Sequence, residues 1–211
     1  MVVVTQDGNG PQYYDRLYEP TYVSNPVTGD YVSFTEVDFF RQNKVHSVVC
    51  GFGYHHSIKK YKVVRIYFNK NQTLGQVQVY TLGCARGWRD LGETTYCSLR
   101  YTWPRGFYNC SPFATLANGA LHLLDKEQKI VSFDLASEKL YLLPPPPFVR
   151  AARVMNYFEL QVLGGSFCFL HQKENEFLDI WFLRSKGEFS SYDVNEQDYD
   201  SLSSASQLDV I

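Results

Sequence analysis

Four strand–turn–strand segments recur along the chain at a spacing of about 50 residues, and this repeat constrains the fold more than any other sequence feature. In each segment an apolar strand ends near a polar or small residue, a turn follows, and a shorter apolar strand returns. The segments are YVSNPVTGDYVSF, VQVYTLGCARGWRDLG, IVSFDLASEKLYLLP and LDIWFLRSKGEFSSY. Their roughly equivalent residues Asn25, Tyr80, Asp134 and Trp181 are 55, 54 and 47 residues apart. A period of about 50 is typical of kelch-type propeller blades, each a four-stranded antiparallel sheet.

Apolar and polar residues alternate with a period of two through much of the chain, as in residues 76–79. No stretch has a sustained helical stripe with caps. The sequence therefore predicts an all-β, antiparallel fold of four-stranded blades in a partial kelch-like β-propeller. The best helical candidate is the short Val149–Phe158 segment. Asn118-Gly119 and Gly164-Gly165 each precede an apolar run, which predicts inner strands where the backbones of neighbouring sheets pass closely.

The composition is that of a globular chain: 45% of the residues are hydrophobic and the formal net charge is −2. This near-neutral balance argues against a chain built chiefly to bind nucleic acid or an anionic membrane. The amino-terminal residues have neither a basic start nor a sustained apolar run, so no secretory signal is expected. The five cysteines form no C-x-x-C pair, which is typical of reduced thiols in an intracellular protein. We therefore expect the protein in the cytoplasm, the nucleus or both, with no nucleic-acid or membrane partner.

The stretch VVCGFGYHHSIKKYKVVRIYF (residues 48–68) contains two glycines and two histidines and offers two interpretations. A phosphate-binding loop would require a helix directly after the glycines, and the sequence signals none. His55 and His56 are adjacent in a strand connection, and no further Cys/His pair completes a tetrahedral metal set. The stretch therefore predicts a β-hairpin with strands at 48–54 and 62–68. We expect its histidines and lysines to be solvent-exposed in the turn.

The same stretch resembles the signature of the plant F-box-associated domain, in which Gly-Phe-Gly-Tyr, a polar turn and Tyr-Lys-Val-Val-Arg occur together. Further matches occur in the family's order: Asn25–Gly29, Val77–Leu82 with Trp88-Arg89, Asn118–His122, Ile130–Leu135 with Leu143-Pro144, Leu163–Gly165 and Asp179–Trp181. Together they span about residues 20–185, which is most of the chain. Each motif alone is weak, but their number and order make the resemblance specific.

The resemblance implies an adaptor of a cullin–RING ubiquitin ligase rather than an enzyme. In that family an amino-terminal F-box docks on a Skp1-type linker, and the associated β-rich domain holds the protein target. The implied function is substrate recognition for an SCF-type E3 ligase, which leads to ubiquitination and degradation of the target. No F-box helices are expected before the Asn-Pro-Val-Thr-Gly hairpin. The linker and the cullin would therefore be reached only through an F-box absent from this sequence.

The predicted organisation has three parts. Residues 1–19 form an amino-terminal lead-in or a remnant strand, residues 20–192 form the F-box-associated β domain, and residues 193–211 form an acidic tail that is expected to be disordered. The repeats amount to one hairpin and about three blades, whereas a closed propeller typically has at least about four. The chain is therefore expected to be a fragment or truncated gene product, or to fold as an open arc with exposed edges.

The connection YCSLRYTWPRGFYNCSPF (residues 96–113) is the strongest candidate for binding a partner. It is longer than an ordinary blade connection and contains the candidate partner-binding residues Tyr101, Trp103, Arg105, Phe107 and Tyr108. Exposed Trp, Tyr and Arg side chains on a loop dominate interface hot spots. The alternative is that these aromatic residues cover the edge of a sheet or form an extra strand, in which case the connection is structural.

A catalytic or cofactor site is a further alternative, and the sequence favours none. Cys168 lacks the G-x-S-x-G elbow of a nucleophile, so it is expected in the core. His122 and His171 lie at strand positions, where a packed or hydrogen-bonded histidine is expected. A kelch-type metal or redox enzyme would need a Tyr/His/Cys set on converging loops, and no spacing indicates one. We expect no catalytic residue, metal ion or cofactor; a protein- or glycan-binding module outside the ubiquitin pathway is the other alternative.

Overall fold

The computed structural model describes residues 2–7, 18–34, 45–69, 72–99, 111–144, 146, 157–173, 177–183 and 189–192. These residues form fifteen β-strands and one short 3-10 helix, η1 (Cys97–Leu99). The all-β, antiparallel class predicted from the sequence is therefore confirmed. Within the described ranges, no helical segment has the length and apolarity needed to cross a bilayer.

The strands form four antiparallel sheets, and strands that are neighbours in sequence are neighbours in each sheet. Sheet 1 contains β1 (Val2–Asp7), β2 (Tyr18–Ser24) and β3 (Tyr31–Ser33). Sheet 2 contains β4 (Val45–His55), β5 (Lys60–Asn69), β6 (Gly75–Thr81) and β7 (Trp88–Thr94). Sheet 3 contains β8 (Thr115–Ala117), β9 (Ala120–Leu124), β10 (Ile130–Asp134) and β11 (Leu140–Leu143). Sheet 4 contains β12 (Tyr157–Leu163), β13 (Ser166–Lys173), β14 (Phe177–Leu183) and β15 (Phe189–Tyr192).

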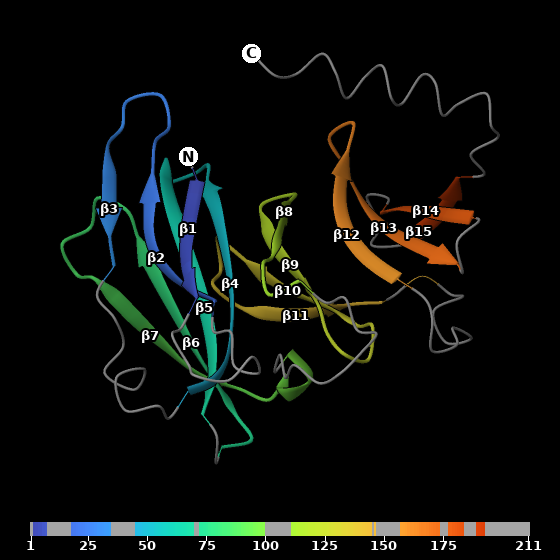
Figure 1. Cartoon of the computed structure of the whole chain (residues 1–211), viewed down its shortest axis with the longest axis horizontal. Helices are drawn as coiled ribbons and strands as arrows, with labels where there is room; N and C mark the ends of the chain where they lie inside the picture. Colours follow the sequence, from blue (N-terminus) through green and yellow to red (C-terminus); the bar gives the residue numbers. More distant parts are fainter. Residues whose placement is uncertain are drawn as a thin grey trace.

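The four sheets follow one another in space in the order of the chain, from sheet 1 in blue to sheet 4 in orange (Figure 1). β2 lies against β4, whereas β8 and β9 lie against both β4 and β12. Each interface between consecutive sheets has its own buried apolar cluster, and we call these interfaces the 1–2, 2–3 and 3–4 seams. The 1–2 seam includes Val23, Phe34 and Val63, the 2–3 seam Phe68, Leu121 and Phe133, and the 3–4 seam Ile130, Phe167 and Phe169.

Two of the predicted hairpin turns share one backbone geometry although they belong to different sheets. In the β2–β3 turn the Gly29 N–H donates to the Asn25 carbonyl oxygen at 2.8 Å, and the Asn25 side-chain oxygen accepts from the N–H two residues further on at 3.1 Å. In the β10–β11 turn the Glu138 N–H donates to the Asp134 carbonyl oxygen at 2.9 Å, and the Asp134 side chain accepts two residues further on at 3.1 Å. Gly29 and Glu138 have φ values of 75° and 56°. This equivalence confirms the repeat identified in the sequence.

The prediction that Asn118-Gly119 leads into a buried inner strand is confirmed by β9, which is buried along its whole length and lies against β4 and β12. The glycines of Asn118-Gly119 and Gly164-Gly165 themselves, however, do not lie at a close approach of two sheets. The three glycines have φ values of 76°, 55° and 77°, and a Cβ added to any of them would meet nothing within 4 Å. They lie in the β8–β9 and β12–β13 turns, where the chain needs a left-handed backbone that glycine adopts without steric cost. Turn geometry, rather than close sheet packing, therefore explains these glycines.

The close approach of two sheets occurs instead in β4, at the 2–3 seam. The Cys50 N–H donates to the Pro112 carbonyl oxygen at 2.8 Å, and the Ala114 N–H donates to the Cys50 carbonyl oxygen at 2.8 Å. These backbone bonds leave no room for side chains beside them. An added Cβ would lie 2.8 Å from the Ala114 Cβ at Gly51, and 2.7 Å from a leucine methyl group at Gly53. Gly51 and Gly53 therefore serve packing between blades, and β4 with β5 forms the predicted hairpin.

The structure differs from the sequence predictions at the beginning of sheet 4. Tyr157 and Phe158 belong to β12, so the predicted helix over Val149–Phe158 is wrong for these two residues, and residues 149–156 lie outside the described ranges. Phe158 is buried in the 3–4 seam, where the strand pairing with β13 favours an extended backbone. The predicted boundary at residue 20 falls within β2, which pairs with β1, and the predicted acidic tail lies outside the described residues.

Candidate recognition surface

The five predicted partner-binding residues lie outside the residues that the structure describes: Tyr101, Trp103, Arg105, Phe107 and Tyr108. Both ends of the connection that contains them are described, and both are anchored. At its start Leu99 is buried in the 2–3 seam. At its end Pro112 and Ala114 are hydrogen-bonded to the backbone of Cys50. The connection therefore leaves and rejoins the sheets at fixed points, as a binding loop on a rigid scaffold does.

A cavity of about 200 Å³ lies directly after this connection, between sheets 3 and 4. Its walls come from the chain before β8, from β8 and β9, and from β12. Its lining includes Phe113, Thr115, His122, Leu124, Glu159 and Gln161. Glu159 and Gln161 could not be identified from the sequence, because only sheet packing brings them to the end of the 96–113 connection.

Polar and apolar groups meet in this cavity. The Gln161 amide nitrogen Nε2 donates to Glu159 Oε1 at 2.6 Å. The Thr115 hydroxyl donates to the Leu160 carbonyl oxygen at 2.9 Å and thereby bridges β8 to β12. On the apolar side, the Phe113 side chain keeps 40% of its surface exposed. The cavity therefore offers a carboxylate, an amide and an accessible aromatic ring within one small space.

His122 lies in the cavity wall, but both of its ring nitrogens are already bonded. Nε2 lies 3.2 Å from the Ala117 carbonyl oxygen and Nδ1 lies 2.7 Å from the Ser132 hydroxyl. Because a carbonyl oxygen can only accept, Nε2 carries the proton and Nδ1 accepts from Ser132. The ring stacks on Phe167 with centroids 4.2 Å apart. Burial lowers the pKa of His122 to about 4, so the ring is neutral at physiological pH, and the prediction of a packed, hydrogen-bonded histidine is confirmed.

The two buried cysteines have the properties of core residues. Cys168 lies in β13, where its thiol donates to the Gln161 carbonyl oxygen at 3.4 Å. Burial raises the pKa of Cys168 to about 11 and that of Cys50 to about 12. Because the thiolate is the reactive form, neither side chain is a nucleophile at neutral pH. The prediction that Cys168 belongs to the core is confirmed.

The remaining described histidines do not form a metal site. His171 is buried, stacks on Phe158 at a centroid distance of 4.7 Å, and places Nδ1 3.3 Å from Asp179 Oδ2. His56 is exposed in the β4–β5 turn, as predicted. The prediction of solvent exposure is wrong for His55, whose ring nitrogens are shielded because β4 continues to this residue and pairs it with Lys60. Among the described residues, no group of three or more His, Cys, Asp and Glu side chains could hold a metal ion.

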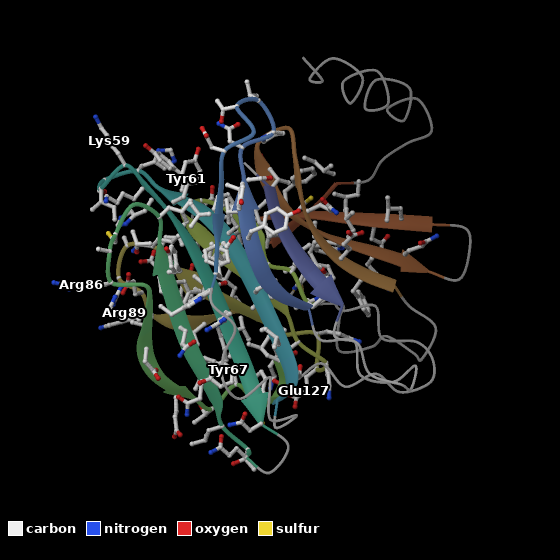
Figure 2. All side chains as sticks on the ribbon, turned by 60° about the vertical axis from the view of Figure 1, so that its left-hand side comes forward. Lys59, Tyr61, Tyr67, Arg86, Arg89 and Glu127 are labelled. Carbon is white, nitrogen blue, oxygen red and sulfur yellow. The ribbon has the colours of Figure 1, made fainter. Side chains whose placement is uncertain are left out.

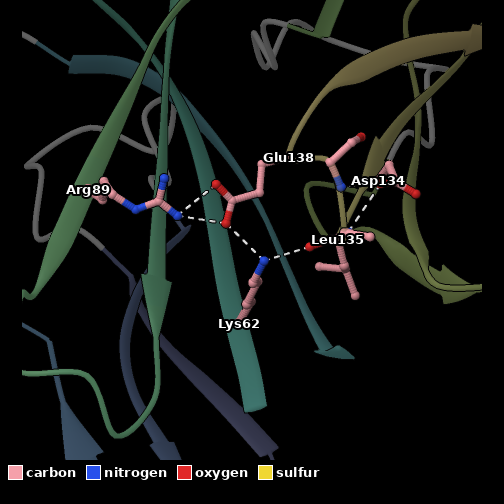
Figure 3. Close-up of polar contacts among 7 residues, drawn as sticks. Lys62, Arg89, Asp134, Leu135 and Glu138 are labelled. Atoms are coloured by element: carbon pink, nitrogen blue, oxygen red, sulfur yellow. Dashed lines mark hydrogen bonds and ion pairs between the residues drawn. The ribbon is translucent and has the colours of Figure 1, made fainter. Parts of the chain in front are cut away.

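A charged cluster joins sheets 2 and 3 at the β10–β11 turn (Figure 3). Lys62 on β5 donates from Nζ to the Leu135 carbonyl oxygen at 2.6 Å and to Glu138 Oε1 at 2.8 Å. Arg89 on β7 donates from Nη2 to both carboxylate oxygens of Glu138, at 2.6 and 2.7 Å. Burial raises the pKa of Glu138, but the hydrogen bonds from Arg89 and Lys62 outweigh this effect and lower the pKa below its usual value. The carboxylate therefore stays ionised and compensates the buried ammonium of Lys62.

Four-stranded meanders that pack seam to seam define the class of this protein as a β-propeller-like domain. Comparison with known proteins gives the family: the family model for the F-box associated beta propeller domain matches residues 7–207, and the chain belongs to this family. The resemblance identified from the sequence motifs is thereby confirmed.

An Arabidopsis thaliana protein, F-box protein At3g07870, is 26% identical to the chain over 208 residues. The match covers 84% of this chain and 46% of the Arabidopsis protein, so the chain spans about half the length of that relative.

Proposed function

We propose that this chain is the substrate-recognition domain of an SCF-type E3 ubiquitin ligase adaptor, which holds a protein target for ubiquitination and degradation. Membership of the F-box associated family and the similarity to an F-box protein support the proposal. Target binding is assigned to the β-propeller domain, and recruitment of a Skp1-type linker and a cullin to an F-box. We propose an intracellular location, in the cytoplasm, the nucleus or both.

The cavity between sheets 3 and 4 is the observation that carries the choice of binding surface. Its volume of about 200 Å³ is smaller than the roughly 300–1,000 Å³ of sites that enclose a drug-sized ligand. A space of this size suits one or two side chains of a bound protein. The exposed ring of Phe113 lies in the same cavity as the polar groups of Glu159 and Gln161, and interface pockets combine such groups.

The protonation states of the described residues support a non-catalytic role over a kelch-type metal or redox enzyme. His122 is neutral with both nitrogens bonded, and the Cys50 and Cys168 thiols stay protonated at neutral pH. The nearest approach to a catalytic pair is Ser132 beside His122, but the Ser132 side chain is fully buried and out of reach of a substrate. A nucleophilic serine must contact both a general base and the substrate. Ser132 contacts the base but is not accessible to a substrate.

The first experiment tests the division of labour between the propeller and the F-box. The purified chain should retain no Skp1-type linker, whereas the same chain fused behind an F-box should retain the linker and a cullin. The fused chain, assembled with the ligase components, should then transfer ubiquitin to a protein that the isolated chain binds. Failure of transfer to a bound protein would contradict the proposed function, and tight linker binding by the isolated chain would mean that the docking surface is misplaced.

The second experiment tests the binding surface. Replacing Trp103 and Arg105 together with Ala should weaken target binding by about 2 kcal/mol or more with a nearly unchanged melting temperature. Glu159→Gln should also weaken binding, whereas Glu93→Gln should not, because Glu93 belongs to an exposed Glu–Gln pair outside the cavity, with Gln76 at 2.8 Å. A collapse of the melting temperature in the Trp103/Arg105 variant would identify the connection as structural cover of the sheet.

A further inference from the structure

Three turns at one end of sheets 2 and 3 form a surface that is basic although the whole chain is slightly acidic. The turns join β4 to β5, β6 to β7, and β10 to β11. Residues 54–62, 82–89 and 134–139, which contain these turns, include six Lys or Arg and two acidic residues, whereas the chain has a net charge of −2. We call this surface the basic face.

Hydrogen bonds and ion pairs hold the three turns of the basic face together. The Lys60 Nζ donates to the Gly83 carbonyl oxygen at 3.2 Å, and the Leu82 N–H donates to the Tyr61 carbonyl oxygen at 2.9 Å. These bonds join the β4–β5 turn to the β6–β7 turn. Lys62 on β5 and Arg89 on β7 both bind Glu138, and these ion pairs join sheet 2 to the β10–β11 turn. These contacts fix the three turns relative to one another before any partner binds, which lowers the entropic cost of binding.

The two acidic residues of the basic face are already engaged. Glu138 accepts from Lys62 and Arg89. Asp134 caps its turn by accepting from the backbone N–H groups of Ala136 and Ser137, and the Ser137 hydrogen bond is the main reason that the pKa of Asp134 is lowered.

The exposed charge of the basic face is therefore positive. Lys59, Arg86 and Lys139 are exposed, and the Arg89 side chain is 43% exposed while it holds Glu138. Figure 2 shows Lys59, Arg86 and Arg89 along one edge of the molecule, with Glu127 at the far end of the strands. Several cations on one face attract a partner with the opposite charge.

We propose that the basic face binds an acidic segment of the target protein, rich in Asp and Glu or carrying phosphorylated side chains. This inference rests on the proposed function in target recognition. Two observations favour a short acidic segment over nucleic acid or an anionic membrane. A long polyanion would extend past the basic face and meet the net negative charge of the chain. Salt screens charges beyond about 10 Å, so a short segment on the basic face interacts mainly with the cations there. The face also contains the exposed side chain of Ile58, which a peptide side chain can cover.

The test measures binding of fluorescent peptides to the full chain. The probes are a glutamate-rich peptide, its phosphoserine counterpart, its glutamine counterpart, and a single-stranded DNA with the same number of negative charges. We expect one or both acidic peptides to bind at least about tenfold more tightly than the glutamine peptide, and binding to weaken as salt is added. Comparison of the two acidic peptides shows whether carboxylate or phosphate is preferred.

Charge-reversal variants assign the binding to the basic face. The pair Lys59→Glu and Arg86→Glu should weaken binding of the acidic peptide by about tenfold or more. The matched pair Lys126→Glu and Lys129→Glu, in the β9–β10 turn at the other end of the strands, should change it by less than about twofold. Circular dichroism confirms that both variants fold.

Three results would overturn the inference: equal binding of the glutamine peptide, equal loss in both variant pairs, or tighter binding of the DNA than of either acidic peptide. The peptide assay contains no ligase component. A negative peptide result with intact ubiquitin transfer would therefore contradict this inference alone, whereas loss of transfer with intact peptide binding would contradict the proposed function alone.

Discussion

The 2–3 seam and the 3–4 seam join the same kind of four-stranded sheet, yet they differ in what crosses them. At the 2–3 seam the backbone of Cys50 bonds directly to the backbone of Pro112 and Ala114. At the 3–4 seam the Thr115 hydroxyl reaches the Leu160 carbonyl oxygen, so a side chain separates the two backbones. The first seam also carries the ion cluster around Glu138, whereas the second encloses the cavity of about 200 Å³. Two seams between sheets of the same kind therefore differ in the groups that cross them, and the cavity lies at the seam that a side chain spans.

The largest effect is expected when the ion cluster of the 2–3 seam loses its carboxylate. Glu138→Ala should lower the free energy of unfolding by about 3 kcal/mol, because it leaves the buried Lys62 ammonium without a counter-charge. Lys62 is only 3% exposed, so water cannot replace the lost partner. Urea unfolding followed by circular dichroism measures the change.

Two control variants test the reason for this loss. The double variant Lys62→Met with Glu138→Ala should recover most of the stability, because an apolar side chain can replace a buried ion pair. Glu127→Ala breaks the exposed pair with Lys129, whose side chains are 59% and 50% exposed, and should cost less than about 1 kcal/mol. Equal losses in Glu138→Ala and Glu127→Ala would show that burial of the cluster does not matter.

The second-largest effect is expected where the backbones approach closely at the 2–3 seam. Gly51→Ala should lower the free energy of unfolding by about 2 kcal/mol, because the new methyl group would lie 2.8 Å from the Ala114 Cβ. Adding Ala114→Gly removes that contact and should restore part of the stability. Simple additivity of the two substitutions in urea unfolding would contradict a direct clash between them.

Mild acid should destabilise the 3–4 seam before the 2–3 seam, because it favours protonation of His122, which lies at the 3–4 seam. The pKa of His122 falls from 6.5 to about 4 on burial. Between these values the unfolded chain binds more protons than the folded chain, so stability is lost as the pH falls through this window. The loss should be about 2 kcal/mol between pH 7 and pH 5. Glu138 behaves differently. Because the pKa of Glu138 is lowered in the folded chain, its contribution to the free energy of unfolding is lost only as the pH falls through the usual range of a carboxyl group and below it.

Hydrogen exchange at the two pH values, together with urea unfolding, measures this difference between seams. Amides of sheet 4 should lose protection at pH 5 before those of sheet 2. His122→Gln should flatten the pH dependence of unfolding. A pH dependence that survives in His122→Gln would assign it to another group.

The smallest effect is expected at the Thr115 hydroxyl, which spans the 3–4 seam. Thr115→Val keeps the shape of the side chain but removes the bond to the Leu160 carbonyl oxygen, and should cost about 1 kcal/mol in urea unfolding. Thr95→Val, at an exposed position, should cost less than about 0.5 kcal/mol. Equal costs would show that the hydroxyl does not hold the 3–4 seam together.

The sequence by itself determined the blade and its family. Alternation with a period of two and turn residues such as Asn25-Pro26 and Gly29 act over a few positions, so they can be recognised without knowledge of the rest of the chain. The spacing of about 50 residues then predicted a meander repeated along the chain. His122 and Cys168 could also be assigned to the core, because each lies in a predicted strand between two apolar neighbours.

Only the tertiary structure decided how the blades meet. The sequence places Gly51 and Gly53 in a strand, but the reason for glycine there depends on Ala114 and Leu135, which are distant in the chain. In the sequence Glu138 is an ordinary turn residue, and only sheet packing places Lys62 and Arg89 beside it. The cavity likewise depends on sheet packing, which brings Glu159 and Gln161 of β12 beside Phe113 and Thr115. Contacts between residues far apart in sequence leave no local pattern, so the seams and the site that they enclose appear only in the folded chain.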